Sequence, residues 1–239
     1  MLENFYDNKT KTLILPPNYN NELINIPKDI NKILFHEQIE YNDKNINLSI
    51  FNLPINNLPT NCKYLKFGTE FNYEVDNLPL NLTHLALGNK FNKKVDNLPI
   101  NLTHLYFGIY FNQSIDLLPK NLKYLYFNLY SKFNKEIEYL PINLKHIDFG
   151  WNFNHSVNNL PNSIIYLSFG HKFNKSIDKL PEKLEYLYFT GDNFNNEINN
   201  LPINLKKMDL SNCYLNNKVK NLPNNLTHLH PSRFKMPII

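Results

Sequence analysis

The sequence is poor in cysteine, with Cys62 and Cys213 as its only two among 239 residues. Because they lie far apart in the chain and have no other metal-binding side chains nearby, neither a disulfide nor a zinc site is expected. No apolar run approaches the roughly 20 residues that a membrane span needs. The N-terminus also lacks a basic segment followed by an apolar one. These absences predict an intracellular, cytoplasmic protein that is neither secreted nor inserted in a membrane.

The sequence also lacks a strong charge imbalance. Its net charge is +4, and the 19% of residues that are charged form no blocks. A mildly basic balance of this kind does not by itself indicate a nucleic-acid-binding protein. The chain is 42% hydrophobic and 14% aromatic, so there is ample material for a core.

What the sequence does contain is a repeat, which is clearest in residues 98–119, LPINLTHLYFGIYFNQSIDLLP. The Leu-Pro step returns every 20 to 22 residues, at Pro59, Pro79, Pro99, Pro119, Pro141, Pro161, Pro181, Pro202 and Pro223. A fixed period of this length predicts a solenoid, which grows in one dimension without dividing into domains.

Each unit contains an apolar–variable–apolar triplet, such as Leu85-Ala-Leu87 or Leu105-Tyr-Phe107. This pattern predicts a short strand with one buried face, and equivalent strands should stack in parallel. The return stretch, FNKKVDNLP in one copy, is too short and too rich in Asn and Pro for a helix. We therefore predict a mainly β fold, a single parallel β solenoid of about ten turns without regular helices on its convex side.

The repeat divides the chain into a lead-in (1–12), a solenoid (13–230) and a C-terminal tail (231–239). An insertion loop (36–50) interrupts the second unit and should emerge on one side. Whether the insertion or the tail covers an end of the solenoid stays open. Pro231 stands where other units have a strand Phe, and we predict that it ends the sheet because proline cannot donate to the ladder.

The Phe-Asn pair of each unit is its most regular feature. We predict that the Phe rings form an internal spine and that the Asn amides bond the backbone of the next turn as an internal ladder. These structural residues are Phe71, Asn72, Phe91, Asn92, Phe111, Asn112, Phe133, Asn134, Phe153, Asn154, Phe173, Asn174, Phe194 and Asn195. A Gly follows the strand where the link to Phe-Asn is shortest, at Gly68, Gly88, Gly108, Gly150 and Gly170, and we expect a φ above zero there.

These lines resemble the FNIP repeat family, named for Phe-Asn-x-x-Ile-x-x-Leu-Pro. The pattern stands here as FNQSIDLLP (111–119), FNKEIEYLP (133–141), FNKSIDKLP (173–181) and FNNEINNLP (194–202). The family is similar to a branch of the leucine-rich repeats, and its members come mostly from amoebae and giant DNA viruses. The resemblance implies a curved, leucine-rich-repeat-like solenoid with an interaction role and without enzymatic activity or cofactor.

The residues between the buried strand positions should point outward together. Tyr and His dominate these columns, and such side chains are typical of binding surfaces, although aromatic residues also pair well across strands in any sheet. We predict a monomer that binds a protein partner, for which a host cell is one source. The predicted contacts on the concave strand face are Tyr64, His84, His104, Tyr106, Tyr124, Tyr126, His146, Tyr166, Tyr186 and Tyr188.

Three alternative functions use the same face. Single-stranded nucleic acid would stack on Tyr while phosphates meet Lys63, Lys66, Lys123, Lys145 and Lys206. A hydrolase would use His146, Asp148 and Ser168, which should be neighbours but lack a visible oxyanion hole. A metal at His84 and His104 would have only two ligands. We therefore predict a non-catalytic scaffold and assign no catalytic residue, metal or cofactor.

Overall fold

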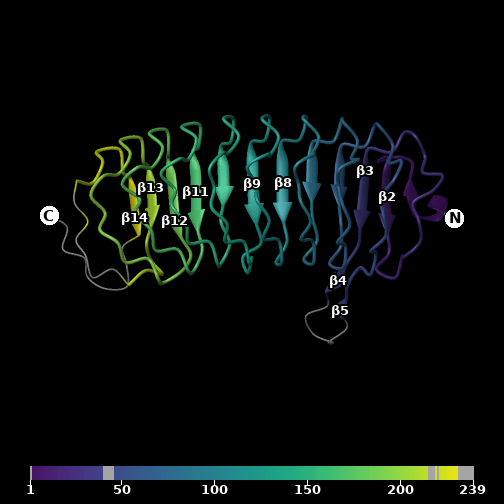
Figure 1. Ribbon diagram of the computed structural model, residues 1–239, viewed down its shortest axis with the longest axis horizontal. Helices are drawn as coiled ribbons and strands as arrows, with labels where there is room; N and C mark the ends of the chain where they lie inside the picture. Colours follow the sequence, from purple (N-terminus) through teal and green to yellow (C-terminus); the bar gives the residue numbers. More distant parts are fainter. Residues whose placement is uncertain (1, 40–45, 215–218, 220, 231–239) are drawn as a thin grey trace.

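The computed structural model describes residues 2–39, 46–214, 219 and 221–230, and these form one β solenoid (Figure 1). Its strands stack along the long axis into a sheet of twelve strands in the described residues, in the order β1-β2-β3-β6 and then consecutively to β14. Every pair from β2 to β14 is parallel and in register. The predicted fold class is confirmed.

The parallel strands are short because the apolar pattern of each unit covers only three or four residues. They are β2 (Thr12–Leu15), β3 (Lys32–Phe35), β6 (Tyr64–Lys66), β7 (His84–Ala86), β8 (His104–Phe107), β9 (Tyr124–Phe127), β10 (His146–Asp148), β11 (Tyr166–Phe169), β12 (Tyr186–Phe189), β13 (Lys207–Asp209) and β14 (His228–His230).

A turn at the Leu-Pro step feeds each strand. In the unit before β8, the Leu102 N–H donates to the Pro99 carbonyl at 3.0 Å, and the same bond recurs in the other units. This closes a four-residue turn in which proline needs no donor of its own. Asn101 supports the turn, since its side-chain amide donates to the Leu80 carbonyl of the preceding unit at 3.0 Å. Sequence analysis missed this second Asn column, which joins successive turns near the start of the strands.

The core lies between the strands and the return stretches, and it is filled by two columns of Phe. The rings of the return column, from Phe51 to Phe194, stack with centroids 6.0 to 6.2 Å apart between successive turns. Each also packs on the strand Phe of its own turn where one exists, for example Phe111 on Phe107 at 3.7 Å. All are buried, as predicted for an internal spine.

The Asn of each Phe-Asn pair forms the predicted ladder. Asn92 accepts a hydrogen bond from the Asn112 backbone N–H at 2.9 Å, and the bond repeats from Asn52 to Asn195 at 2.9 to 3.0 Å. The ladder is not internal, however, because its side chains are exposed or half-buried. It runs along the surface beside the Phe spine, where the chain turns into the return stretch.

The glycines after the strands do not have the conformation we expected. No described glycine has a positive φ. The reason for glycine is instead the close approach of the preceding turn: a Cβ on Gly108 would lie 2.2 Å from the Gly88 carbonyl oxygen, and one on Gly88 would lie 1.7 Å from that of Gly68. The requirement comes from the stacking of turns and not from the turn's own dihedral angles.

The described part of the insertion lies at the carboxyl ends of the strands, beyond one edge of the sheet in Figure 1. Its strands β4 (Gln38–Ile39) and β5 (Ile46–Asn47) pair with each other in antiparallel fashion. Because they do so, the insertion returns to the point where it left. The chain then rejoins the solenoid through Ser49, whose carbonyl accepts from the Glu70 N–H at 3.3 Å.

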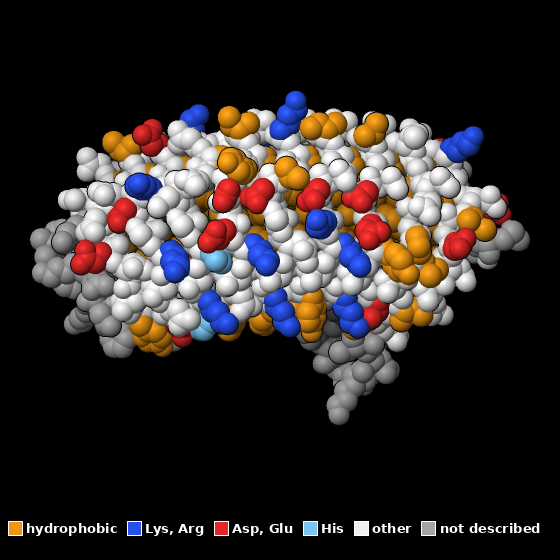
Figure 2. All heavy atoms as spheres, viewed as in Figure 1, with side chains coloured by type: hydrophobic (Ala, Val, Ile, Leu, Met, Phe, Trp, Pro, Cys, Tyr) orange, Lys and Arg blue, Asp and Glu red, His pale blue; other side chains and the backbone are white. Residues whose placement is uncertain are grey.

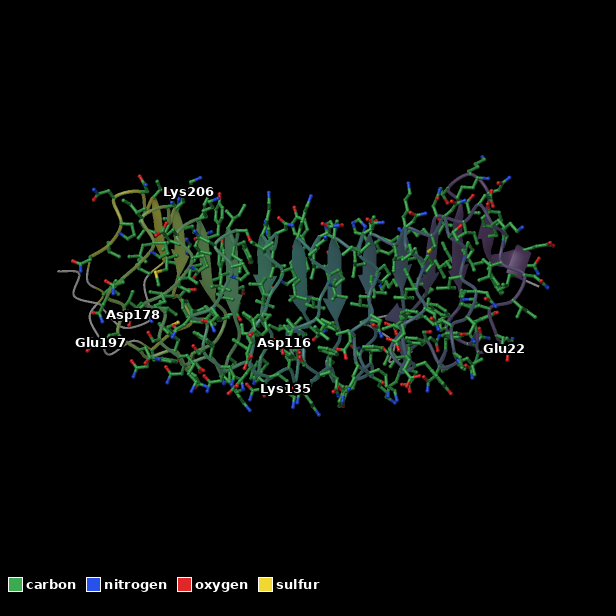
Figure 3. The ribbon with its side chains drawn as sticks, turned by 45° about the horizontal axis from the view of Figure 1, so that its top comes forward. Glu22, Asp116, Lys135, Asp178, Glu197 and Lys206 are labelled. Carbon is green, nitrogen blue, oxygen red and sulfur yellow. The ribbon has the colours of Figure 1, made fainter. Side chains whose placement is uncertain are left out.

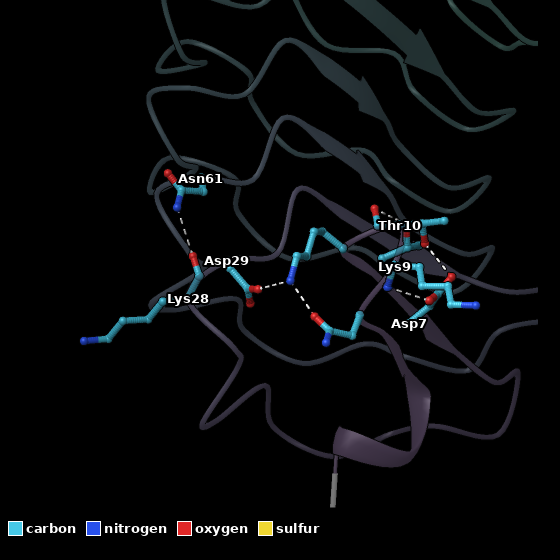
Figure 4. A network of polar contacts seen from close by, with 9 residues as sticks. Asp7, Lys9, Thr10, Lys28, Asp29 and Asn61 are labelled. Atoms are coloured by element: carbon cyan, nitrogen blue, oxygen red, sulfur yellow. Dashed lines mark hydrogen bonds and ion pairs between the residues drawn. The ribbon is translucent and has the colours of Figure 1, made fainter.

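The lead-in forms a cap on the N-terminal end. A short 3-10 helix, η1 (Leu2–Phe5), precedes β1 (Tyr6–Asp7), which pairs with β2 in antiparallel fashion. Figure 4 shows the polar contacts beside it: Lys11 Nζ lies 2.6 Å from an oxygen of Asp29, and Asp7 accepts from the Thr10 hydroxyl at 2.7 Å. At the other end β14 is the last described strand, and Pro231 with the tail lies outside the described residues.

The return stretches form the side of the solenoid opposite the sheet. In Figure 3, Asp116, Lys135 and Asp178 lie below the strands, whereas Lys206 lies beside them at the upper edge. Figure 2 shows a long face on which Lys and Asp or Glu side chains follow one another from turn to turn. The return side is thus charged on its surface and uniform in its backbone contacts.

Candidate functional site

The outward side chains of the sheet, here called the strand face, form three columns. Register places Tyr64, His84, His104, Tyr124, His146, Tyr166 and Tyr186 in one line, the central column, which continues to Lys207 and His228. A second column, here called the inner column, is formed by the residue two positions later in each strand. It contains Lys66, Ala86, Tyr106, Tyr126, Asp148, Ser168, Tyr188, Asp209 and His230. A third column, from Lys63 and Thr83 to Thr227, lies just before the strands. All ten predicted contact residues lie on this face.

The aromatic rings of the central column stack on one another. Centroids are 5.6 Å apart from Tyr64 to His84, 4.0 Å from His84 to His104 and 4.3 Å from His104 to Tyr124. The stack continues through His146 to Tyr166, at 4.8 and 5.4 Å. The rings are therefore half-buried, and their neighbours in the stack restrict their movement.

Threonines of the third column orient two of the histidines. Thr103 Oγ1 donates to the Thr83 carbonyl at 3.0 Å and lies 2.9 Å from His104 Nδ1, and Thr83 makes the equivalent contacts with Lys63 and His84. Desolvation, followed by the charges of His84, Lys123 and His146, lowers the pKa of His104 to about 4. Desolvation also lowers the pKa of His84. These rings are thus neutral at pH 7 and act as flat, uncharged surfaces.

The inner column is more varied. Tyr106 and Tyr126 stack at 4.8 Å, and beyond them Asp148 and Ser168 interrupt the tyrosines. Desolvation raises the pKa of Asp148 to about 6, against the effect of a hydrogen bond with Ser168. Burial and the Asp148 charge raise the pKa of Tyr166 to about 12.

A shallow depression of about 350 Å³ lies over Ala86, with Tyr64, Tyr106 and Tyr126 among its lining residues.

The structure does not favour the hydrolase or the metal site that we considered as alternatives. Ser168 is 2% exposed, so its hydroxyl does not face an incoming substrate. The His84 and His104 rings stack face to face, and no cluster of three His, Cys, Asp or Glu side chains suited to a metal occurs in the part of the chain that the structure describes.

Sequence analysis missed a row of aromatic residues at the carboxyl edge of the strands. Tyr130 lies 6.0 Å from Trp151, whose ring stacks on His171 at 4.3 Å, and His171 Nδ1 lies 3.0 Å from Asp192. Lys132 lies over the Tyr110 ring at 4.2 Å. The available signal was an aromatic residue directly after the strand glycine at Trp151 and again 20 residues later at His171, whereas Tyr130 lies in a longer link and does not align with them.

The open parallel sheet, the stacked turns and the absence of helix from the described returns define a leucine-rich-repeat-like solenoid. The FNIP repeat model matches residues 51–90, 91–130, 133–172 and 173–213, well over half of the chain. The chain belongs to the FNIP repeat family.

Solved structures of similar fold come from a virus and from bacteria. The chain is 35% identical to CroV588, a giant-virus protein described as a circular leucine-rich-repeat structure, with a TM-score of 0.68 over 91% of this chain. It spans 36% of the length of CroV588. YopM from Yersinia enterocolitica is 21% identical, with a TM-score of 0.57 over 90% of this chain and 56% of YopM. The internalin InlF from Listeria monocytogenes is 14% identical, with a TM-score of 0.51 over 94% of this chain and 81% of InlF.

A comparison with curated proteins finds no significant match. Among the described residues, no helix has the length and apolar character required to cross a membrane. The fold is that of leucine-rich-repeat proteins, which are usually non-enzymatic and serve as protein-interaction scaffolds.

Proposed function

We propose that the protein is a non-catalytic scaffold that binds a protein partner through the strand face. The observation that carries the proposal is the contrast between repeated and varied positions. The turns repeat their Phe, Asn and Leu-Pro residues, whereas the strand face collects Tyr and His in its middle and changes toward both ends. Large amphipathic rings of this kind supply much contact area at low entropy cost.

The centre of the proposed interface is the group Tyr106, Tyr124, Tyr126, Tyr186 and Tyr188, flanked by His104, His146 and Tyr166. Tyr106 and Tyr186 are 39% and 36% exposed, and the other tyrosines of the group are half-buried. A partner would therefore contact ring edges and hydroxyl groups more than ring faces. Binding residues tend to cluster near the middle of an interface, and this group lies near the middle of the sheet.

The contacts of the lysines favour a protein partner over single-stranded nucleic acid. Lys206 Nζ pairs with Glu185 at 2.8 Å, and Lys207 lies over the Tyr188 ring at 5.3 Å. Asp148 and Asp209 stand in the inner column beside the tyrosines that would stack bases. Stacking of successive rings on one another also leaves fewer ring faces for bases.

The test compares the two sides of the solenoid. A partner is first captured from cell lysate at two salt concentrations, with and without nuclease, and its affinity is then measured by calorimetry. Changing Tyr106 and Tyr126 together to Ser should weaken binding by about 2 kcal/mol or more. The return-side variants Lys94→Ser and Lys135→Ser should leave the affinity unchanged.

Two results would overturn the proposal. One is loss of binding in the return-side variants with normal binding by the double Tyr variant. The other is capture that disappears with nuclease and falls steeply with salt, which would identify a nucleic acid as the partner.

We also propose an intracellular location, since the structure holds two buried free thiols. Burial raises the pKa of Cys62 to about 11, and burial with the nearby Asp209 and Asp192 raises that of Cys213 to about 12. Cysteines that stay unpaired are typical of reducing compartments, whereas secreted proteins commonly pair theirs in disulfides. Fractionation of the source cell followed by immunoblotting tests the location, and recovery from the secreted fraction would contradict it.

A further inference from the structure

The inner column contains a notch at Asp148, where the row of tyrosines is interrupted. Tyr126 on β9 is in register with Asp148, which is in register with Ser168, and Ser168 is followed by Tyr188. Ser168 is buried beside Tyr166 and Tyr188, whose rings lie 5.2 Å apart. Along this column, Asp148 is therefore the smaller side chain between the Tyr126 ring and the Tyr166–Tyr188 pair, and we call this position the notch. Neighbouring strands lie about 4.8 Å apart, a spacing that matches the thickness of one planar group.

No basic side chain of the described residues forms an ion pair with Asp148. Its side chain forms a hydrogen bond with the hydroxyl of Ser168, which carries no charge. A carboxylate that is partly removed from water without a cation is unfavourable. The fold places such a group on the face that we propose as the interface.

Asp209, farther along the same column, is a carboxylate whose hydrogen-bond donors come from the chain itself. It accepts hydrogen bonds from the Ser211 backbone N–H at 3.0 Å and from the Ser211 hydroxyl at 2.7 Å. Desolvation opposes ionisation of Asp209, but the bonds from Ser211 together with the charges of His230 and Lys207 outweigh it and lower its pKa. Two carboxylates in one column thus differ in whether the chain itself provides their partners.

We propose that the notch at Asp148 receives an arginine side chain of the protein partner. Its guanidinium would donate to the Asp148 carboxylate and stack on the Tyr126 ring. Arginine fits both features because it is planar, carries several donors in a fixed fork and stacks on aromatic faces. A carboxylate or a phosphate would be repelled by Asp148. This inference rests on the proposed function and names the chemistry of its central contact.

The direct test uses a small probe, N-acetyl-Gly-Arg-Gly-amide, titrated into the full chain and followed by amide chemical shifts in NMR. The arginine peptide should bind weakly, with the largest shifts on β9 to β12. Asp148→Asn should weaken it at least tenfold, whereas the matched variant Asp209→Asn should leave it unchanged. Equal binding of the same peptide with citrulline, the neutral isostere, or with lysine in place of arginine would overturn the assignment.

The pH dependence provides a second measurement. Since only ionised Asp148 attracts a cation, affinity should fall about tenfold from pH 7.5 to pH 5, and Asp148→Asn should remove that change. The other titratable groups facing the notch are Tyr126 and Tyr166, whose pKa values are raised by burial, together with Tyr188 and His146. Desolvation and Lys145 lower the pKa of His146, so His146→Gln should retain the pH dependence. Loss of the dependence in His146→Gln, with retention in Asp148→Asn, would contradict the proposal.

The stability of the free protein separates a binding role from a structural one. A raised pKa in the folded state means that the fold prefers protonated Asp148, so stability falls as the pH rises from the ordinary pKa of 3.8 to about 6, and the full loss remains at pH 7.5. Asp148→Asn should therefore keep or raise the melting temperature at pH 7.5, and a clear fall would show that Asp148 supports the fold. If the double Tyr variant weakens partner binding and Asp148→Asn does not, only the arginine contact fails. If neither does, the strand-face proposal fails as well.

Discussion

The strand face and the return side of this solenoid are built from the same repeat but follow different rules. On the return side the same residue meets its own copy in every turn, as in the column of Asn side chains from Asn52 to Asn195. On the strand face the register is equally strict, but the side chains of the inner column change from Lys and Ala to Tyr, then to Asp and Ser. The residues that stack one turn on the next are mostly the same in every turn, whereas the outward residues of the strand face vary.

This contrast separates the residues that hold the array together from those available for recognition. Nearest-neighbour contacts dominate the stability of solenoids, so a fault in one uniform column weakens the turns on both sides. A change on the strand face should instead act locally. The three predictions below concern positions that stack one turn on the next, where stability should fall while partner binding in the folded protein is retained.

The largest effect is expected for Phe111→Ala. The Phe111 ring is fully buried and stacks on Phe91, Phe107 and Phe133, at 6.2, 3.7 and 6.1 Å. Emptying such a site should lower the free energy of unfolding by about 3–5 kcal/mol, as measured by urea denaturation. Hydrogen exchange should also accelerate in β7 and β9. The control is Leu117→Ala, whose side chain is 65% exposed, and a loss below about 1 kcal/mol in Phe111→Ala would show that the rings are not the spine.

Periodicity predicted the parts of the fold that depend on residues of the same unit. The buried set Leu82, Leu85, Leu87, Phe91, Val95 and Leu98 is at most 8% exposed, because period-two strands and a fixed repeat leave few alternatives. The reason for glycine at position 108 was not predictable, since it depends on how closely the preceding turn approaches. The antiparallel cap formed by β1 was also missed, because the lead-in carries no repeat pattern.

The candidate site also has features that the sequence predicted and features that it did not. The membership of each column followed from the strand pattern, and the register confirms it. The stacking of the rings, which leaves most tyrosines half-buried, and the lack of a cation near Asp148 within the described residues depend on side-chain placement across several turns. A single unit of the sequence holds no such information.

An intermediate effect is expected for Gly108→Ala. The added Cβ would lie 2.2 Å from the Gly88 carbonyl oxygen and 2.5 Å from Asn89 Cα, so the backbone of two turns must separate. This overpacking should cost about 1–3 kcal/mol in the free energy of unfolding. Thr190→Ala is the matched control, since Thr190 occupies the same place in a turn with a longer link and is exposed; it should lose only the bond from its hydroxyl to the Phe169 carbonyl at 3.1 Å. If urea denaturation gives Gly108→Ala and the parent the same free energy of unfolding, the turns can separate without loss of stability.

The smallest effect is expected for Asn134→Ala, which removes one bond of the Asn ladder. The Asn134 side chain accepts from the Asn154 N–H at 2.9 Å, and the Asn134 backbone N–H donates to Asn112 at 2.9 Å. Only the first of these bonds is lost, and water reaches this exposed column, so the loss should be about 1 kcal/mol. Asn134→Asp keeps an acceptor oxygen and should lose less. Hydrogen exchange of the Asn154 amide is the sharpest measurement: it should accelerate in Asn134→Ala and stay near the parent rate in Asn134→Asp. If the amide is equally protected in all three proteins, the column of side chains is a consequence of stacking and does not contribute to it.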